Sequence, residues 1–235
     1  MIPKILHFCW FGPNSIDSTS KRCINTWRKN CPGFQIIKWT EINSNYQESK
    51  FATDAYKLKK FAFVADYIRI KKLYEYGGIY LDTDMFLIKS LEKLRLNSCF
   101  FGYESQIYVA AGIIGAVPKH PFLKQILDTY DELIFKEIAI ETFTIPKLIT
   151  KLLDVGKPTD ITLYPIDFFY PYTWEDHFKK LKIIDILKFC TVNTYAIHLW
   201  NASWTKEAPK SFVTQKMIRI KTIFKKIVMK VFIKG

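Results

Sequence analysis

The sequence has few cysteines, no long hydrophobic run and no cluster of Cys and His residues spaced to bind zinc. The longest apolar run, residues 107–117, is too short to cross a membrane. Residues 1–12 lack the basic segment and long apolar stretch of a signal peptide. The five cysteines are scattered, which predicts reduced core thiols in a cytoplasmic protein. They are Cys9, Cys23, Cys31, Cys99 and Cys190.

Acidic residues are absent from the C-terminal segment. The chain has 35 Lys and Arg against 22 Asp and Glu, a formal net charge of +13. Residues 208–235 contain eight basic residues and no acidic one, so subtracting eight from thirteen leaves +5 for residues 1–207. This modest charge and the lack of a nucleic-acid-binding motif argue against a basic nucleic-acid-binding domain.

The change in composition near residue 207 predicts two parts. We expect a single domain over residues 1–207, because no repeat and no low-complexity linker interrupts it. Over residues 208–235 we expect a basic amphipathic helix, with apolar positions from Met217 to Val231 on one side. Such a helix fits either an anionic membrane surface or a docking face on the domain. The sequence leaves both possibilities open.

Strand-like and helix-like segments alternate in the first part of the chain, which is typical of an α/β sheet. Residues 2–10 are apolar on both faces, as in a central parallel strand, and a second strand is expected over 34–39. Between them we expect a helix over 20–30, capped by Ser18 or Thr19.

Apolar residues spaced by three or four predict one long helix over residues 54–76, ended by Gly77 and Gly78 in the left-handed conformation. Residues 79–82 resume as a strand. Further strands are expected at 100–103, 107–117 and 195–200, and further helices at 122–136 and 146–153.

Two carboxylates follow one of the predicted strands, in the segment Ile79-Tyr80-Leu81-Asp82-Thr83-Asp84. Because side chains alternate along a strand, Tyr80, Asp82 and Asp84 should point the same way. Neighbouring carboxylates repel each other unless a cation lies between them, and Mg²⁺ or Mn²⁺ would suit oxygen ligands. A solvated Asp-x-Asp turn is the alternative. The position at the carboxyl end of a strand favours a ligand site, since open α/β sheets bind ligands there.

Asp66 and Arg69 are three positions apart on the predicted helix, at the flank of its apolar face. They could form a surface ion pair of little consequence. They could also reach a ligand above the carboxylate strand, where the arginine would bind oxygens and the aspartate would accept hydroxyl hydrogen bonds.

Taken together, the segments IPKILHFCWFG, ADYIRIKKLYEYGGIYLDTDMFLIKSL, FTIPKLITKLL, YPIDFFYP and AIHLWNASW resemble the DXD-containing glycosyltransferases of family 32. That family includes bacterial capsular and O-antigen sugar transferases, the yeast initiating mannosyltransferase and, distantly, the clostridial toxin glucosyltransferase domains. The block from Asp66 to Asp84 carries most of the resemblance. The chain departs from the family at Thr144-Ile145-Pro146, where Thr-Gly-Pro is usual.

The resemblance implies a GT-A fold: a mixed, Rossmann-like α/β sheet flanked by helices. It also implies a nucleotide-sugar donor, UDP-sugar in preference to GDP-sugar, and Mn²⁺ or Mg²⁺ on its diphosphate. Retention of configuration at the anomeric carbon would follow. The acceptor would be a surface glycan such as capsule or O-antigen, in some cases lipid-linked. The enzyme would lie in the cytoplasm or on the inner face of the membrane.

At the nucleotide end, the resemblance implies that Trp10 stacks on the base while the backbone of Cys9 reads its edge. Asp82 would contact the ribose and the water shell of the metal, and Asp84 would bind the metal directly. From the residues alone, Trp10 could equally be a core side chain at a strand end.

At the sugar end, the resemblance implies that Asp66 and Arg69 hold the hydroxyls of the donor sugar, with Tyr80 lining the same face. His198 and Trp204 match the C-terminal segment that closes over the diphosphate, and His198 would be a third metal ligand. By itself, His198 could also be a core histidine in an apolar strand.

A phosphatase is the alternative enzyme class. Phosphatases of the haloacid dehalogenase type also place Asp-x-Asp after an apolar strand, but they require a downstream Gly-Asp followed by another acid, which this sequence lacks. No nucleophile and base pair is evident either, as expected for a front-face retaining transfer that needs no enzymic base. We therefore predict a metal-dependent hexosyltransferase.

Overall fold

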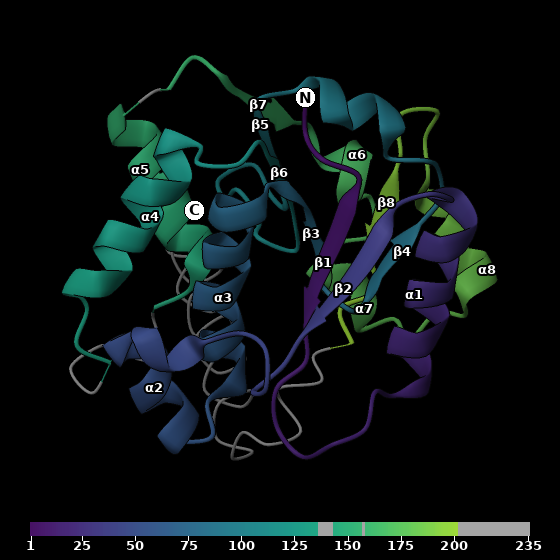
Figure 1. Cartoon of the computed structure of the whole chain (residues 1–235). Helices are drawn as coiled ribbons and strands as arrows, with labels where there is room; N and C mark the ends of the chain where they lie inside the picture. The colour runs from purple at the N-terminus through teal and green to yellow at the C-terminus, as the bar shows by residue number, and fades with distance from the viewer. Residues whose placement is uncertain (136–142, 157, 202–235) are drawn as a thin grey trace, which may run out of the picture. The chain divides into compact units, whose positions relative to one another are not determined.

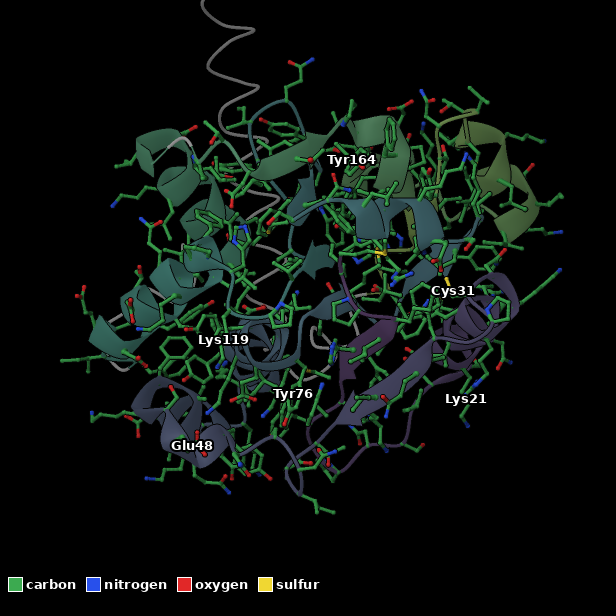
Figure 2. All side chains as sticks on the ribbon, turned by 45° about the horizontal axis from the view of Figure 1, so that its top comes forward. Lys21, Cys31, Glu48, Tyr76, Lys119 and Tyr164 are labelled. Carbon is green, nitrogen blue, oxygen red and sulfur yellow. The ribbon has the colours of Figure 1, made fainter. Side chains whose placement is uncertain are left out.

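The computed structural model describes residues 1–135, 143–156 and 158–201 of the chain. These residues form a six-stranded mixed sheet in the order β2-β1-β3-β6-β5-β7, together with a two-stranded sheet of β4 and β8. Helices α2, α3, α4 and α5 lie on one side of the large sheet and α1 lies on the other (Figure 1). Side chains fill the space between these layers (Figure 2). None of the described helices is long and apolar enough to span a bilayer.

The first βαβ unit is confirmed. β1 (Ile5–Cys9) pairs in parallel with β2 (Gln35–Trp39), and α1 (Ser18–Asn30) connects them. The predicted cap of α1 is wrong by one or two residues. Asp17 caps the helix, because its carboxylate accepts the N–H of Ser20 at 2.9 Å.

The long helix expected over residues 54–76 is two helices, α2 (Lys50–Lys57) and α3 (Phe61–Tyr76). The helical conformation is interrupted between them at Lys59, which has a φ of 56°. The apolar spacing continues across the break because Ala55 and Val64 pack into the same core. Periodicity therefore could not reveal the interruption.

Two glycines follow α3, and close packing is what requires them. Gly77 and Gly78 have φ values of 63° and 109°. A Cβ on Gly78 would lie 2.7 Å from Nε2 of His7, and one on Gly77 would lie 2.6 Å from Pro118. The ψ of Gly77 is −169°, so the expected left-handed helix cap is replaced by an extended turn into β3 (Gly78–Leu81). The turn holds His7, whose Nε2 lies 2.8 Å from the carbonyl of Gly77.

Five strands of the large sheet run in one direction. β3 is parallel to β1 and antiparallel to β6 (Ile113–Ala116), which in turn is antiparallel to β5 (Cys99–Gly102). β5 is parallel to β7 (Ile161–Tyr164). The carboxyl ends of β1, β3 and β5 therefore meet at one edge, where the chain also enters β6. The strand expected over residues 107–117 is only this shorter β6.

The remaining elements are two predicted helices, the two-stranded sheet and several short helices. α4 (Pro121–Glu132) and α5 (Ile145–Gly156) occupy the regions predicted as helices. β4 (Met85–Leu87) pairs antiparallel with β8 (Ala196–His198), which matches the expected late strand. Short helices α6 (Ile166–Phe169), α7 (Trp174–His177) and α8 (Ile183–Ile186) lie between β7 and β8. The short 3₁₀ segments are Tyr46–Glu48, Glu92–Leu96 and Leu187–Phe189.

The apolar core is divided by the sheet into two main clusters. In one cluster, helices α2, α3, α4 and α5 pack against one face of the strands. In the other, α1 packs against the opposite face. Cys9, Cys23, Cys31 and Cys99 are buried, as expected of core thiols, whereas Cys190 is only half-buried. The buried layers leave the carboxyl edge of the strands as the place where polar side chains gather.

Candidate active site

Asp82 lies directly after β3, at the edge where the parallel strands end. Its backbone N–H donates to the carbonyl of Gly112 at 2.8 Å, and its Oδ1 accepts the hydroxyl of Tyr80 at 3.1 Å. Tyr80 is 2% exposed, so it has no free face for a ligand and acts by holding Asp82. Asp82 keeps 28% of its side chain exposed and remains accessible.

Arg69 connects the two predicted acidic positions. Its Nη2 lies 2.8 Å from Oδ1 of Asp66, and its Nη1 lies 3.3 Å from Oδ1 of Asp82. Nη1 also donates to the carbonyl of Ala111 at 2.8 Å, and the guanidinium lies 4.6 Å from the ring centre of Tyr80. The arginine side chain is 7% exposed. The surface ion pair considered from the sequence is therefore wrong, because the pair is buried and joined to the carboxylate strand.

Burial shifts the titration of Asp66. Its pKa is raised to about 6, mainly because burial disfavours the charged carboxylate, and the nearby Asp82 adds to the effect. The positive charge of Arg69 opposes the shift. Asp66 therefore changes its charge near pH 6, and 13% of its side chain is exposed.

Asp84 is held by the C-terminal part of the described chain. β3 ends at Leu81, so Asp84 lies in a turn and not on the strand, and alternation is not what brings it beside Asp82. Its Oδ1 lies 3.0 Å from Nε2 of His198, and its Oδ2 accepts the backbone N–H of Asn201 at 2.9 Å. The turn and the end of β8 thus bring together residues more than a hundred positions apart.

Charge pairing dominates the titration of Asp84 and His198. Burial alone would raise the pKa of Asp84, but the charge and hydrogen bond of His198 and the N–H of Asn201 lower it. Burial alone would lower the pKa of His198, but the charge and hydrogen bond of Asp84 raise it. The histidine is enclosed by Trp200, with ring centres 4.1 Å apart, and by Tyr170 at 5.7 Å.

Asp82, Asp84 and His198 could together hold a metal ion. One ligand atom from each lies within 4.8 Å of the others, which is the spacing expected around a single cation. Two carboxylates and one imidazole suit Mn²⁺ better than Mg²⁺, because Mg²⁺ favours an all-oxygen shell. The chemistry of the donor set therefore fits the divalent metal predicted from the sequence.

Trp10 follows β1 at the same edge of the sheet. It is half-buried and lies outside the buried core, and its indole N–H donates to the carbonyl of Asn14 at 2.7 Å. This placement disfavours the core interpretation of Trp10. Cys9, by contrast, is 7% exposed, so only its backbone could contact a ligand. Trp204 lies outside the described residues, and its role stays a prediction.

Sequence reasoning missed the backbone groups that complete the site. The carbonyls of Ala111 and Gly112, and the N–H of Asn201, hold Arg69, Asp82 and Asp84. Only the pairing of β3 with β6 and of β4 with β8 brings these groups to the site. The local sequence carries no signal of either pairing.

Gly112 is expected to be intolerant of a side chain. A Cβ there would lie 2.9 Å from the hydroxyl of Tyr170 and 3.1 Å from Oδ2 of Asp82. Gly112→Ala should cost about 1–3 kcal/mol of unfolding free energy through overpacking. It should also weaken Mn²⁺ binding, measured by calorimetry. In the control Gly156→Ala, the nearest atom would lie at 3.8 Å, so both properties should be kept. Normal Mn²⁺ affinity in a folded Gly112→Ala protein would contradict the geometry described.

Part of the chain is similar to known proteins. Residues 17–101 match the family model described as glycosyltransferase sugar-binding region containing DXD motif. The chain is 29% identical over 149 residues to alpha-1,4-N-acetylglucosaminyltransferase of Homo sapiens, covering 58% of this chain and 42% of that protein. It is 31% identical over 142 residues to inositol phosphoceramide mannosyltransferase 1 of Schizosaccharomyces pombe, covering 53% of this chain and 41% of that protein. The chain therefore spans less than half of the length of either relative.

A solved structure shares the fold. The PaToxG glycosyltransferase superposes with a TM-score of 0.53 at 18% identity, covering 65% of this chain and 69% of that one. The fold is of the GT-A type, as predicted. Residues 17–101 therefore resemble the sugar-binding region of DXD-containing glycosyltransferases, and the fold is shared with a solved glycosyltransferase structure.

Proposed function

We propose that this chain is a metal-dependent retaining glycosyltransferase that moves a hexose from a nucleotide-sugar, with UDP-sugar favoured, to a glycan acceptor. The observation that carries the proposal is the convergence of Asp82, Asp84 and His198 at the carboxyl edge of the sheet. A divalent cation held there would neutralise the charge that develops on the departing nucleotide diphosphate.

The chain's own residues would orient the donor around that point. Arg69 holds the carboxylate of Asp82 through an ion pair. His198 and the backbone N–H of Asn201 hold the carboxylate of Asp84. We assign the sugar hydroxyls to the partly exposed carboxylate of Asp66. Arg69 would then act mainly by positioning, because its guanidinium is already engaged with two carboxylates and a carbonyl.

For the acceptor we propose a lipid-linked glycan of capsule or O-antigen type, with the enzyme at the cytoplasmic face of a membrane. The relative from Schizosaccharomyces pombe, named for inositol phosphoceramide, supports a lipid acceptor. The basic segment 208–235 would supply contact with anionic lipid. It lies outside the described residues, so the amphipathic helix stays a prediction.

The experiment that tests the function is a donor screen on the intact chain. UDP- and GDP-sugars are added with and without Mn²⁺, and thermal stabilisation and slow hydrolysis of the donor are measured. The proposal predicts that a nucleotide-sugar stabilises the protein and is hydrolysed only with metal present. Metal-independent phosphate release from simple phosphoesters, without any response to nucleotide-sugars, would favour a phosphatase instead.

Trp10 should contribute to nucleotide affinity. If its indole stacks on the base, Trp10→Ala should weaken UDP binding by about 1–3 kcal/mol, by analogy with base–aromatic stacking in single-stranded nucleic acids. Calorimetric titration with UDP and Mn²⁺ measures this loss. The control Trp174→Ala removes another half-buried indole, which stacks on His177. Unchanged UDP affinity in Trp10→Ala, with a large loss of thermal stability, would place Trp10 in the core.

Asp66 should make turnover depend on pH in a way that asparagine cannot. Because its pKa is raised to about 6, the carboxylate is charged above that pH and becomes neutral below it. The ratio of donor turnover in the unmodified chain to that in Asp66→Asn should therefore fall as the pH drops from 7.5 to 5. Taking the ratio cancels the titration of all other groups. UDP affinity should change less than turnover. A ratio that stays constant over this range would contradict the assignment.

A further inference from the structure

A polar cavity lies beside the metal-binding residues, on the side of α1, α7 and α8. It has a volume of about 320 Å³. Its apolar lining includes Tyr172, Ile186 and Leu199, and three basic side chains also line it. They are Arg22 on α1, His177 at the end of α7 and Lys180 in the loop that follows.

Two of these basic side chains have no counter-charge among the residues that the structure describes. Within the described residues, neither Arg22 nor Lys180 lies within ion-pair distance of a carboxylate. Neighbouring lysines differ, since Lys179 pairs with Asp176 at 2.6 Å and Lys188 with Asp185 at 2.7 Å. Lys180 itself has a φ of 50°, an uncommon conformation for a residue with a side chain. Unpaired cations that meet at one cavity repel each other and favour binding of an anion.

The two carboxylates that Asn201 connects to the cavity, those of Asp17 and Asp84, are already hydrogen-bonded. Asn201 lines the cavity, and its side-chain amide donates to Oδ2 of Asp17 at 2.9 Å. The other oxygen of Asp17 accepts the N–H of Ser20, and Asp84 is paired with His198. No carboxylate of the described residues lines the cavity itself, whereas Arg22 and Lys180 do, and the metal-binding carboxylates are separated from it by Asn201.

We propose that this cavity binds a phosphate group attached to an apolar chain, as in the head group of a lipid-linked acceptor. Arg22 and Lys180 would pair with the phosphate oxygens, since guanidinium and ammonium groups are the usual partners of phosphate. The apolar side chains of Tyr172, Ile186 and Leu199 would contact the adjoining carbons. This assignment deepens the proposed function. Only the identification of the ligand as an acceptor rests on that function. The phosphate site itself does not depend on it.

The test uses the intact chain and three probes in calorimetric titrations. Octyl phosphate, below its micelle concentration, carries both the anion and the chain, inorganic phosphate carries only the anion, and octyl glucoside only the chain. Octyl phosphate should bind about tenfold more tightly than inorganic phosphate, because a short buried alkyl segment contributes that much. Octyl glucoside should bind more weakly still. If octyl phosphate and inorganic phosphate bound with equal affinity, the lipid assignment would be overturned. If octyl glucoside bound as tightly as octyl phosphate, the phosphate site would be overturned.

A charge-matched pair of variants ties the binding to this cavity. Arg22→Gln with Lys180→Gln should weaken octyl phosphate binding by about tenfold or more, the usual loss when a charged hydrogen-bond partner is removed. The control Lys21→Gln with Lys182→Gln removes the same charge from neighbouring positions that do not line the cavity. Lys21 lies on the outer side of α1 (Figure 2). Thermal unfolding of both variants confirms that they are folded. Equal binding by the two variants would overturn the proposal.

Competition separates this cavity from the donor site. UDP with Mn²⁺ should not displace octyl phosphate from the unmodified chain, and displacement would show that the cavity belongs to the donor site and overturn the proposal. Hydrolysis of nucleotide-sugar without acceptor, measured on the same preparation, tests the proposed function separately. Phosphate binding without hydrolysis would therefore leave the cavity assignment intact while the enzymatic assignment failed.

Discussion

Asp84→Ala is expected to abolish metal-dependent turnover of the donor, with a loss of at least about 100-fold, the upper range for residues that merely support a metal site. The carboxylate is the central member of the candidate metal site, because it contacts both His198 and the N–H of Asn201. Removing it should also leave these two groups without a partner and cost about 1–3 kcal/mol of unfolding free energy. Mn²⁺-dependent hydrolysis and thermal unfolding, measured together, check both effects.

A second variant separates the loss of charge from the loss of structure. Asp84→Asn keeps the size of the side chain and an oxygen for the N–H of Asn201, so it should fold normally and still lose turnover. Asp128→Ala, an exposed aspartate paired with Lys124 on α4, serves as the control and should keep full activity. Retention of Mn²⁺-dependent turnover in folded Asp84→Asn would rule out Asp84 as a metal ligand.

Arg69→Met is expected to be the most destabilising substitution at the site. The guanidinium is 7% exposed and bridges Asp66 and Asp82, so its loss leaves a carboxylate buried without its cation. Removing one partner of a buried ion pair typically costs about 3–5 kcal/mol of unfolding free energy. Denaturant unfolding measures the change. The pKa of Asp66 should rise further in the variant, because Arg69 is the group that lowers it.

The matched control for this substitution is Arg28→Met on α1. Its guanidinium is exposed and donates to Asn25, so the change should lie within about 0.5 kcal/mol, as for other surface positions. Arg69→Lys is the informative intermediate, because an ammonium group keeps the charge but cannot bridge two carboxylates in a plane. A loss in Arg69→Met no larger than that in Arg28→Met would show that the buried network contributes little to stability.

Local patterns predicted most of the elements, and they failed where tertiary contacts decide the backbone. The β1-α1-β2 unit followed from two apolar segments with a helical segment between them. The break between α2 and α3 did not, because the positive φ of Lys59 leaves the apolar spacing unchanged. The short β4 and β7 were also missed. Each has few residues, and each is defined by a distant partner strand.

The sequence predicted which residues belong to the candidate site, but it did not predict the contacts between them. Resemblance over Asp66 to Asp84 supplied the acidic residues and Arg69, and a separate block supplied His198. The bridge from Arg69 to Asp82 could not be derived, because it depends on how α3 packs against the end of β3. The carbonyl of Ala111, which completes the bridge, arrives through the antiparallel pairing of β6.

The central claim, that Asp82, Asp84 and His198 bind one divalent metal, is tested most directly by titrating Mn²⁺ into the protein. Free Mn²⁺ is followed by its electron paramagnetic resonance signal, in the presence of UDP. The account predicts that the unmodified chain removes about one equivalent of Mn²⁺ from solution, in keeping with a mononuclear site. Asp84→Asn and His198→Ala should remove none, while Asp128→Ala behaves as the unmodified chain. Equal Mn²⁺ binding by all four proteins would contradict it.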